Sequence, residues 1–198
     1  MTGQLHEERM AAVMAAVRAG APARVLDLGC GDGDMLVRLA AEPCIAALVG
    51  LDIDEGALAR ARARLARVAA TAGRVDLRLG SMLAPPDDLV GWDCAVLVET
   101  IEHIEPGQLS RLEQALFSRL RPARVVLTTP NAEFNRLLGV PARRRRHPDH
   151  RFEWTRAQFR TWCARAVRGR GFDVTITDIA GAHPDLGGAS QMAVFTRA

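Results

Sequence analysis

The sequence feature that most constrains the fold is the stretch RVLDLGCGDGD, which spans residues 24–34. Its apolar first half has the length of a buried strand, and Gly29, Gly31 and Gly33 follow directly, before the helical pattern MLVRLAAE. Glycine permits a tight turn and lets a ligand approach the N-terminus of the next helix closely. The stretch therefore predicts an α/β sheet that binds a nucleotide-like ligand beside the glycines.

The same alternation of strand and helix patterns continues along the chain. Further apolar runs have the length expected of strands that crossover helices bury on both faces. These runs span residues 46–53, 74–81, 92–99 and 124–130. Two later strand patterns, at 171–181 and 190–198, are joined by a Gly- and Pro-containing segment and indicate an antiparallel pair. We therefore predict a doubly wound, Rossmann-like sheet of five parallel strands plus a C-terminal antiparallel hairpin.

Length and loop pattern indicate a single domain over residues 1–198, because a chain of this size buries one substantial core. We expect an N-terminal helix over residues 1–20 and a longer helix over 55–73. The Pro- and Arg-rich segment 131–153 is expected to be a loop insertion after the fifth strand, and loops of that length are usually functional or disordered.

Composition excludes several classes of protein. No apolar run reaches the length of a membrane span, and charged residues near the N-terminus argue against a signal peptide, so a cytoplasmic protein without a membrane partner is expected. The four cysteines are scattered, which indicates neither a zinc site nor a disulfide framework. Every basic residue is Arg, and Arg binds phosphate through two parallel hydrogen bonds where it clusters, as at 143–146.

Asp52 ends the second strand about twenty residues beyond the glycines, where a carboxylate can accept both hydroxyls of an adenosine ribose. Both NAD and S-adenosylmethionine fit that arrangement. A dinucleotide site has the spacing G-x-G-x-x-G, whereas this loop reads GCGDG with Asp27, Asp32 and Asp34 around it. Those carboxylates would repel a pyrophosphate and attract a sulfonium with an amino group. A dehydrogenase is accordingly the weaker alternative.

The segment VETIEHIEPGQL (98–109) follows the fourth strand, at the edge of the sheet where such folds bind their ligands. If residues 99–103 form a helical turn, Glu99, Glu102 and His103 fall on one face. Two carboxylates and one imidazole suit Mg²⁺ or Mn²⁺, and one more ligand is needed. His147 and His150 of the long loop can supply it. Alternatively, the Glu and His residues bury the start of a helix or act as a base without metal.

These motifs resemble known families. DLGCGDGD is similar to motif I of the class I S-adenosylmethionine-dependent methyltransferases. LVETIEHIE, TTPNAEFN, HPDHRFEWTRAQF and GASQMAVF together resemble the small-RNA 3′-terminal 2′-O-methyltransferases of the HUA ENHANCER family, over roughly residues 24–196. The resemblance implies metal-dependent transfer of a methyl group from S-adenosylmethionine to the 2′ hydroxyl of the terminal ribose of an RNA 3′ end.

The resemblance also implies roles for individual residues. The methyl donor would contact Asp27, Gly29 and Gly31 with its methionine part, Asp52 with its ribose, and Ser81 and Met82 with its adenine. One divalent ion, Mg²⁺ or Mn²⁺, would be bound by Glu99, Glu102, His103 and His150. His147 would support these ligands or contact RNA, and either His103 or His147 would accept the proton.

Candidate RNA contacts lie in and before the long loop. Arg143, Arg144, Arg145 and Arg146 could bind the phosphates of the RNA end, although a solvated Arg-rich loop explains the run as well. Phe152 and Trp154 could stack on the terminal base, or pack the loop onto the sheet. Asn131, Phe134 and Asn135 follow the fifth strand and are expected to line the substrate side.

Two other functions stay open from the sequence. One is a metal-independent methyltransferase for a small molecule such as a quinone precursor, and the other is a non-catalytic RNA-binding module. The resemblance adds an RNA-repair kinase and phosphatase as partners, which bacterial members meet through an N-terminal half. Here the chain begins just before the fold, as expected of an excised domain or a stand-alone relative, and this puts the partnership in doubt.

Overall fold

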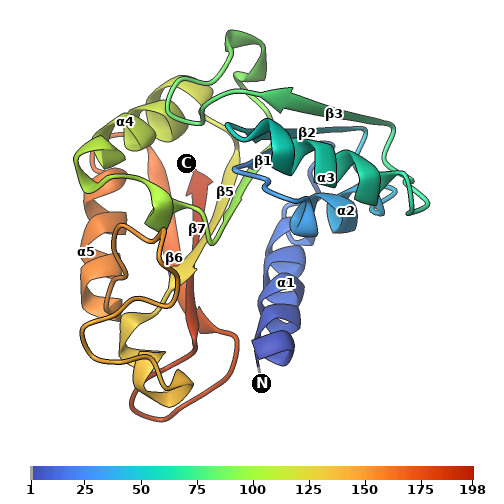
Figure 1. Cartoon of the computed structure of the whole chain (residues 1–198). Helices are drawn as coiled ribbons and strands as arrows, with labels where there is room; N and C mark the ends of the chain where they lie inside the picture. Colours follow the sequence, from blue (N-terminus) through green and yellow to red (C-terminus); the bar gives the residue numbers. More distant parts are fainter. Residues whose placement is uncertain (1) are drawn as a thin grey trace.

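Seven strands form one mixed sheet in the computed structural model, which describes residues 2–198. The order across the sheet is β3-β2-β1-β4-β5-β7-β6 (Figure 1). The strands are β1 (Arg24–Leu28), β2 (Ala47–Asp52), β3 (Arg74–Leu79), β4 (Cys94–Val98), β5 (Arg124–Pro130), β6 (Phe172–Ile179) and β7 (Ser190–Arg197). The first five are parallel, and β7 runs antiparallel between β5 and β6. The predicted doubly wound sheet with its C-terminal hairpin is confirmed.

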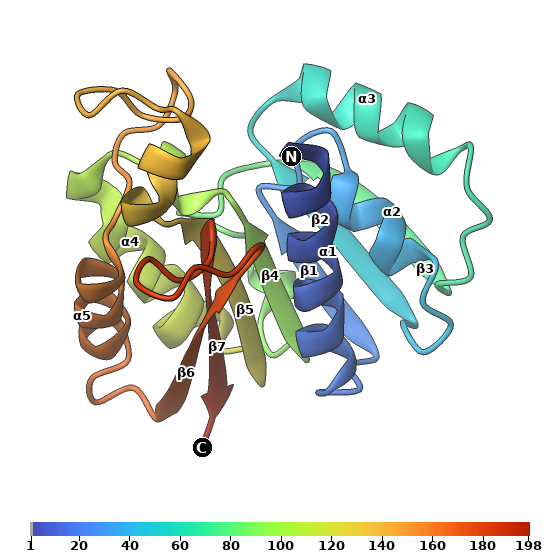
Figure 2. The same cartoon turned by 90° about the horizontal axis from the view of Figure 1, so that it is seen from below.

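Helices cover both faces of this sheet, as Figures 1 and 2 show. The helices are α1 (Thr2–Arg18), α2 (Asp34–Ala40), α3 (Glu55–Leu65), α4 (Leu109–Gln114) and α5 (Arg156–Ala166). Shorter turns are η1 (Asp87–Leu89), η2 (Ile101–His103), η3 (Pro106–Gln108), η4 (Ala115–Leu120) and η5 (Ala132–Leu138). Among residues 2–198, none of these helices is both long and apolar enough to cross a bilayer.

Alternating side chains of the strands feed two apolar cores, one on each face. Leu26 and Leu28 of β1 belong to the core under α4 and α5, whereas Val25 belongs to the core under α1 and α2. This explains why the strands are apolar throughout, since both of their faces are buried.

One predicted helix boundary was wrong. The helix expected over 55–73 ends at Leu65, which packs on the core, because the only larger apolar side chain between Leu65 and Gly73 is the exposed Val68. The segment 131–153 lies between β5 and α5 and contains the 3₁₀ helix η5 near its start. Its remaining part lies at the same end of the sheet as the N-terminus of α1 (Figures 1 and 2).

Candidate active site

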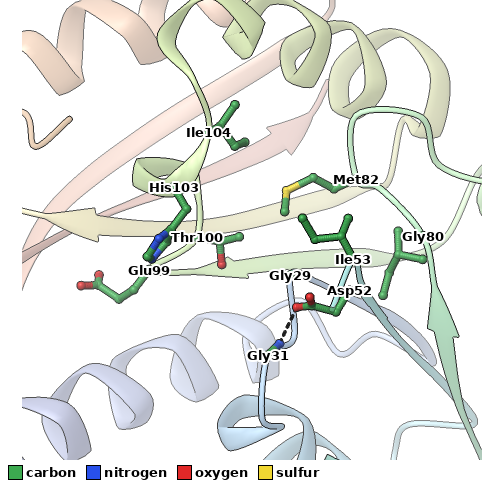
Figure 3. Close-up of a pocket in the computed structure, with 11 residues that line it drawn as sticks. Gly29, Gly31, Asp52, Ile53, Gly80, Met82, Glu99, Thr100, His103 and Ile104 are labelled. Atoms are coloured by element: carbon green, nitrogen blue, oxygen red, sulfur yellow. Dashed lines mark hydrogen bonds between the residues drawn. The ribbon is translucent and has the colours of Figure 1, made fainter. Parts of the chain in front are cut away.

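The glycine loop adopts a backbone that other residues tolerate poorly. Gly29 and Gly31 have φ angles of 76° and 51°, in the left-handed region. A Cβ atom at Gly29 would also lie 2.3 Å from Cγ2 of Thr100. The loop is held to β2 because the Gly31 backbone N–H donates to Oδ2 of Asp52 at 2.8 Å, the dashed line in Figure 3.

A cavity of about 320 Å³, here the glycine-loop cavity, opens beside this loop. Its lining is Gly29, Gly31, Leu51, Asp52, Ile53, Gly80, Met82, Glu99, Thr100, His103 and Ile104. Figure 3 shows Ile53 and Met82 on one side and Glu99 with His103 on the other. The Ile53 side chain is 74% exposed, which leaves an apolar surface free to contact a ligand. Ser81 lies between the lining residues Gly80 and Met82, and its hydroxyl accepts a hydrogen bond from the Leu83 N–H.

A second cavity of about 290 Å³, here the α1 cavity, lies between α1 and the glycine loop. Asp27 lines it, and oxygen Oδ2 of this buried carboxyl has no hydrogen-bond partner among residues 2–198. Burial, and secondarily the charge of Asp52, raises the pKa of Asp27 to about 7. Such a buried, unpaired acid favours a cationic ligand, because a positive group would offset the cost of its ionisation.

A third cavity of about 410 Å³, here the histidine cavity, adjoins the start of α1 and the long loop. At its wall Glu102, His103 and His150 each place one ligand atom within 4.8 Å of the others. The backbone explains the meeting, because the Arg151 N–H donates to the Glu102 carbonyl oxygen at 2.7 Å. That bond joins the loop after β5 to the turn after β4, two segments far apart in the sequence.

Glu99, the fourth predicted ligand, is placed differently. The helical turn assumed over 99–103 is shorter than predicted, because η2 begins only at Ile101. Glu99 has a left-handed φ of 50°, and its N–H still bonds to the Thr128 carbonyl oxygen of β5. Its carboxylate Oε2 accepts from Nη1 of Arg9 at 3.2 Å, outside the group of three.

The charges at this wall favour a cation. Glu102 is fully buried. Thr129 donates to its Oε2 at 3.0 Å, but Oε1 has no hydrogen-bond partner in the described part of the chain. Burial and the charge of Glu99 raise the pKa of Glu102 well above its ordinary value. Burial and the neighbouring His150 and His147 lower the pKa of His103, so its imidazole is neutral at pH 7 and keeps a free lone pair. Unpaired carboxylate oxygen with neutral imidazole is a donor set that fits Mn²⁺ or Mg²⁺.

His147 lies near these ligands without joining them. Its ring centroid is 6.0 Å from that of His103 and 5.6 Å from that of His150. The side chain is 54% exposed and lines the histidine cavity. It can therefore exchange protons with solvent while it stays close to the ligand group.

The four consecutive arginines divide into two kinds. Arg143, Arg144 and Arg145 are exposed and line a surface hollow, and Arg145 also donates to the His150 carbonyl oxygen at 3.0 Å. Arg146 is turned inward, where its guanidinium donates to the carbonyl oxygens of Ala189 and Asn131 and to Oδ1 of Asn135. Its hydrogen bonds are thus made within the protein, and it braces the loop.

The other predicted RNA contacts pack against, or hydrogen-bond to, other parts of the protein. Asn131 is buried and donates to the carbonyl oxygens of Leu186 and Gly188, and Phe134 belongs to a small apolar cluster. Phe152 stacks on Trp154 at 4.2 Å between centroids, and Trp154 in turn packs against Trp162. Asn135 donates to Glu153. The residues that line the histidine cavity are instead Leu5, His6, Arg9, Glu99, Glu102, His103, Pro130, Leu138, Arg146, His147, His150 and Ala189.

Sequence reasoning missed four contributors to this site. Leu5, His6 and Arg9 of α1 line the histidine cavity, although the sequence predicted only a helix over residues 1–20. Glu153 was also missed, despite standing three residues after His150. Burial raises the pKa of Glu153, but hydrogen bonds from His150 and Asn135 outweigh it and the net shift is downward.

Comparison with known proteins agrees with this geometry. A family model described as a methyltransferase domain matches residues 25–123. Small RNA 2′-O-methyltransferases of Xenopus tropicalis and Mus musculus are each 36% identical to this chain over 98% of it, covering 55% and 51% of their own lengths. The chain thus spans about half the length of these curated relatives.

A solved structure extends the comparison to the whole fold. The methyltransferase domain of bacterial CtHen1-CN is 32% identical, with a TM-score of 0.86 over 97% of this chain and 99% of that one. Both the sequence and the arrangement of its elements are therefore shared along almost the entire length. The chain belongs to the small RNA 2′-O-methyltransferase family.

Proposed function

We propose that this protein transfers a methyl group from S-adenosylmethionine to the 2′ hydroxyl of the 3′-terminal ribose of RNA, with one divalent ion, Mg²⁺ or Mn²⁺. The observation that carries the proposal is the position of His103. It belongs to the cluster of three potential metal ligands and lines both the glycine-loop cavity and the histidine cavity. A donor in the first cavity and an acceptor in the second would thus meet beside the same side chain.

The chain offers a complementary group for each part of the donor. Asp27 has an unpaired carboxylate oxygen for the methionine ammonium group. Asp52, fixed by the N–H groups of Gly31 and Asp54, can accept the ribose hydroxyls. Ile53 and Met82 give apolar surface for the adenine. A methyl donor that lies across the α1 and glycine-loop cavities, with its methionine part at Asp27 and its adenine at Met82, would direct its methyl group toward Thr100 and His103.

Glu102, His103 and His150 would hold the ion, with Glu99 nearby. The ion supplies positive charge that favours ionisation of a neighbouring ribose hydroxyl. Recognition of adjacent 2′ and 3′ hydroxyls selects a terminal nucleotide, since an internal one has its 3′ oxygen esterified. Because His103 belongs to the ligand group, the half-exposed His147 is the better placed of the two to accept the proton.

The exposed Arg143, Arg144 and Arg145 are the proposed phosphate contacts of the RNA end, since they line a surface hollow together with His147. Arg145 also donates to the His150 carbonyl oxygen at 3.0 Å, so Arg143 and Arg144 are the freer of the three. Arg146 has an internal role. The repair kinase and phosphatase remain a prediction from the resemblance.

The test uses purified protein, labelled methyl donor and short RNAs that differ only at the 3′ end. Transfer is expected to an end with free 2′ and 3′ hydroxyls, and not to a 2′-deoxy or 3′-phosphate end. A chelator should abolish transfer, and added Mn²⁺ or Mg²⁺ should restore it. Transfer that survives the chelator would contradict the metal requirement, and binding of RNA without transfer would favour a non-catalytic module.

The pKa of Asp27 predicts a pH dependence of donor binding. The affinity for S-adenosylhomocysteine, which keeps the methionine ammonium, should weaken as pH falls through about 7, because the protonated acid no longer attracts the cation. Asp27→Asn should bind it weakly at every pH from 6 to 8.

The free energy of unfolding should fall with rising pH, whereas the affinity for the donor should rise. Because the folded pKa of Asp27 exceeds its unfolded value, ionisation costs stability as pH rises from about 4 to about 7. Asp27→Asn should therefore raise the free energy of unfolding at pH 8, and hardly at all at pH 4, measured by urea titration. Asp173→Asn, on the exposed side of β6, is the control. An unchanged or lower stability at pH 8 would contradict the prediction.

A further inference from the structure

Glu153 is a buried carboxylate at the base of the long loop, and its side chain is only 4% exposed. Three donors converge on it. Nδ1 of His150 lies 2.6 Å from its Oε1, Nδ2 of Asn135 donates to its Oε2 at 2.6 Å, and the Arg146 backbone N–H donates to its Oε1 at 2.7 Å. The Glu153 side chain is thus fixed by contacts with other parts of the loop and with η5.

The residues behind Glu153 are anchored in turn to the sheet. The Arg146 guanidinium donates to Oδ1 of Asn135 and to the carbonyl oxygens of Asn131 and Ala189. Asn131 follows β5 directly, and Ala189 precedes β7 directly. The position of Glu153 is therefore set by the rigid part of the fold, and no bound ion is needed to define it.

The contact in front of Glu153 fixes the His150 ring. Because Nδ1 faces Glu153, Nε2 is the nitrogen left for the cluster with Glu102 and His103. A carboxylate that accepts from Nδ1–H holds the imidazole in the tautomer whose Nε2 carries a lone pair. The ring itself is buried, with 7% of the residue exposed, so water does not replace this partner.

We propose that Glu153 is a positioning residue, which holds His150 in the tautomer and orientation that present Nε2 to the ion-binding group. The proposal rests on the proposed metal-dependent function and deepens it. It also gives a role to the inward-facing Arg146, which completes the support of Glu153 in place of a phosphate contact.

The first experiment measures the affinity for Mn²⁺ by electron paramagnetic resonance, without RNA or methyl donor. Glu153→Gln keeps the size of the side chain but removes its charge and one acceptor, and we expect Mn²⁺ affinity to fall roughly ten- to a hundredfold. Affinity for S-adenosylhomocysteine should be unchanged. The matched control is Glu133→Gln, which loses the ion pair with Arg156 in the same region and should bind Mn²⁺ as the wild type does. Wild-type Mn²⁺ affinity in Glu153→Gln would overturn the proposal.

A second measurement is made on the wild-type protein and does not depend on whether Glu153→Gln folds. Nitrogen-15 NMR of labelled histidine distinguishes the two ring tautomers, and loss of a signal in His150→Asn assigns it. We expect Nδ1 of His150 to carry the proton in the metal-free protein at pH 7.5; a proton on Nε2 would overturn the proposal. Absence of Mn²⁺ binding by the wild type would instead refute the metal requirement, and the NMR result would still decide the role of Glu153.

Discussion

Glu102→Gln is expected to abolish binding of the divalent ion and to lower methyl transfer roughly a thousandfold, because a metal ion contributes several kcal/mol to such reactions. Folding should not suffer. The wild-type carboxylate is fully buried with Oε1 unpaired, and a neutral amide is less costly to bury there than an ionised carboxylate. The combined result, lost activity with retained stability, would mark Glu102 as a functional residue.

Metal titration, single-turnover transfer and urea unfolding measure the three effects. The control is Glu105→Gln, three residues further on, whose exposed side chain pairs with Arg151 at 3.1 Å. That variant should keep its metal affinity, since Glu105 lies outside the cluster of Glu102, His103 and His150. If Glu102→Gln kept wild-type activity, the assignment of the ion-binding group would be wrong.

Alanine substitutions in the glycine loop should separate two effects. Gly29→Ala should lower the free energy of unfolding by about 2–5 kcal/mol, because it adds an overpacked contact to an unfavourable left-handed backbone. The new Cβ would lie 2.3 Å from Thr100 Cγ2 at a φ of 76°. Donor binding should be lost as well, since the loop cannot keep its shape.

Gly31→Ala should behave differently, because a Cβ there meets no atom of the described residues within 4 Å and the residue lines the glycine-loop cavity. We expect a cost of about 1–2 kcal/mol from the left-handed φ, and at least a tenfold loss of S-adenosylhomocysteine affinity from the methyl group in the cavity. Gly107→Ala, at an exposed position with open space, should change stability by less than about 0.5 kcal/mol. Calorimetry and thermal unfolding test all three. Full donor affinity in Gly31→Ala would show that the ligand lies elsewhere.

The strands and the glycine loop could be predicted because their signals are local. A strand buried on both faces needs an apolar run, and the backbone angles at Gly29 and Gly31 need glycine. Asp52 was likewise predicted from its position in the sequence, at the end of the second strand pattern and about twenty residues beyond the glycines. Asp27 was chosen by resemblance, and its burial and unpaired oxygen are visible only in the structure.

The remaining site depends on contacts that the sequence does not encode locally. Glu99 was expected in a helical turn, but it follows the end of β4 with a left-handed φ, its N–H bonds to Thr128 of β5, and η2 begins only at Ile101. Arg146 is an arginine like the three residues before it, and it is distinguished by the hydrogen bonds that it donates to the carbonyl oxygens of Asn131 and Ala189. Arg9 reaches Glu99 across ninety residues, which no spacing rule would connect. Such long-range partners were beyond prediction from one sequence.

Glu99 and His103 line both the glycine-loop cavity and the histidine cavity. Ligands bound in the two cavities would therefore contact the same two ionisable side chains. Ligands that touch a common wall are linked thermodynamically. Whatever factor a bound ion contributes to donor affinity, the donor must contribute to ion affinity. Donor affinity measured with and without saturating ion, and ion affinity measured with and without saturating donor, would therefore give the strength of this cooperativity. The two measurements must give the same factor.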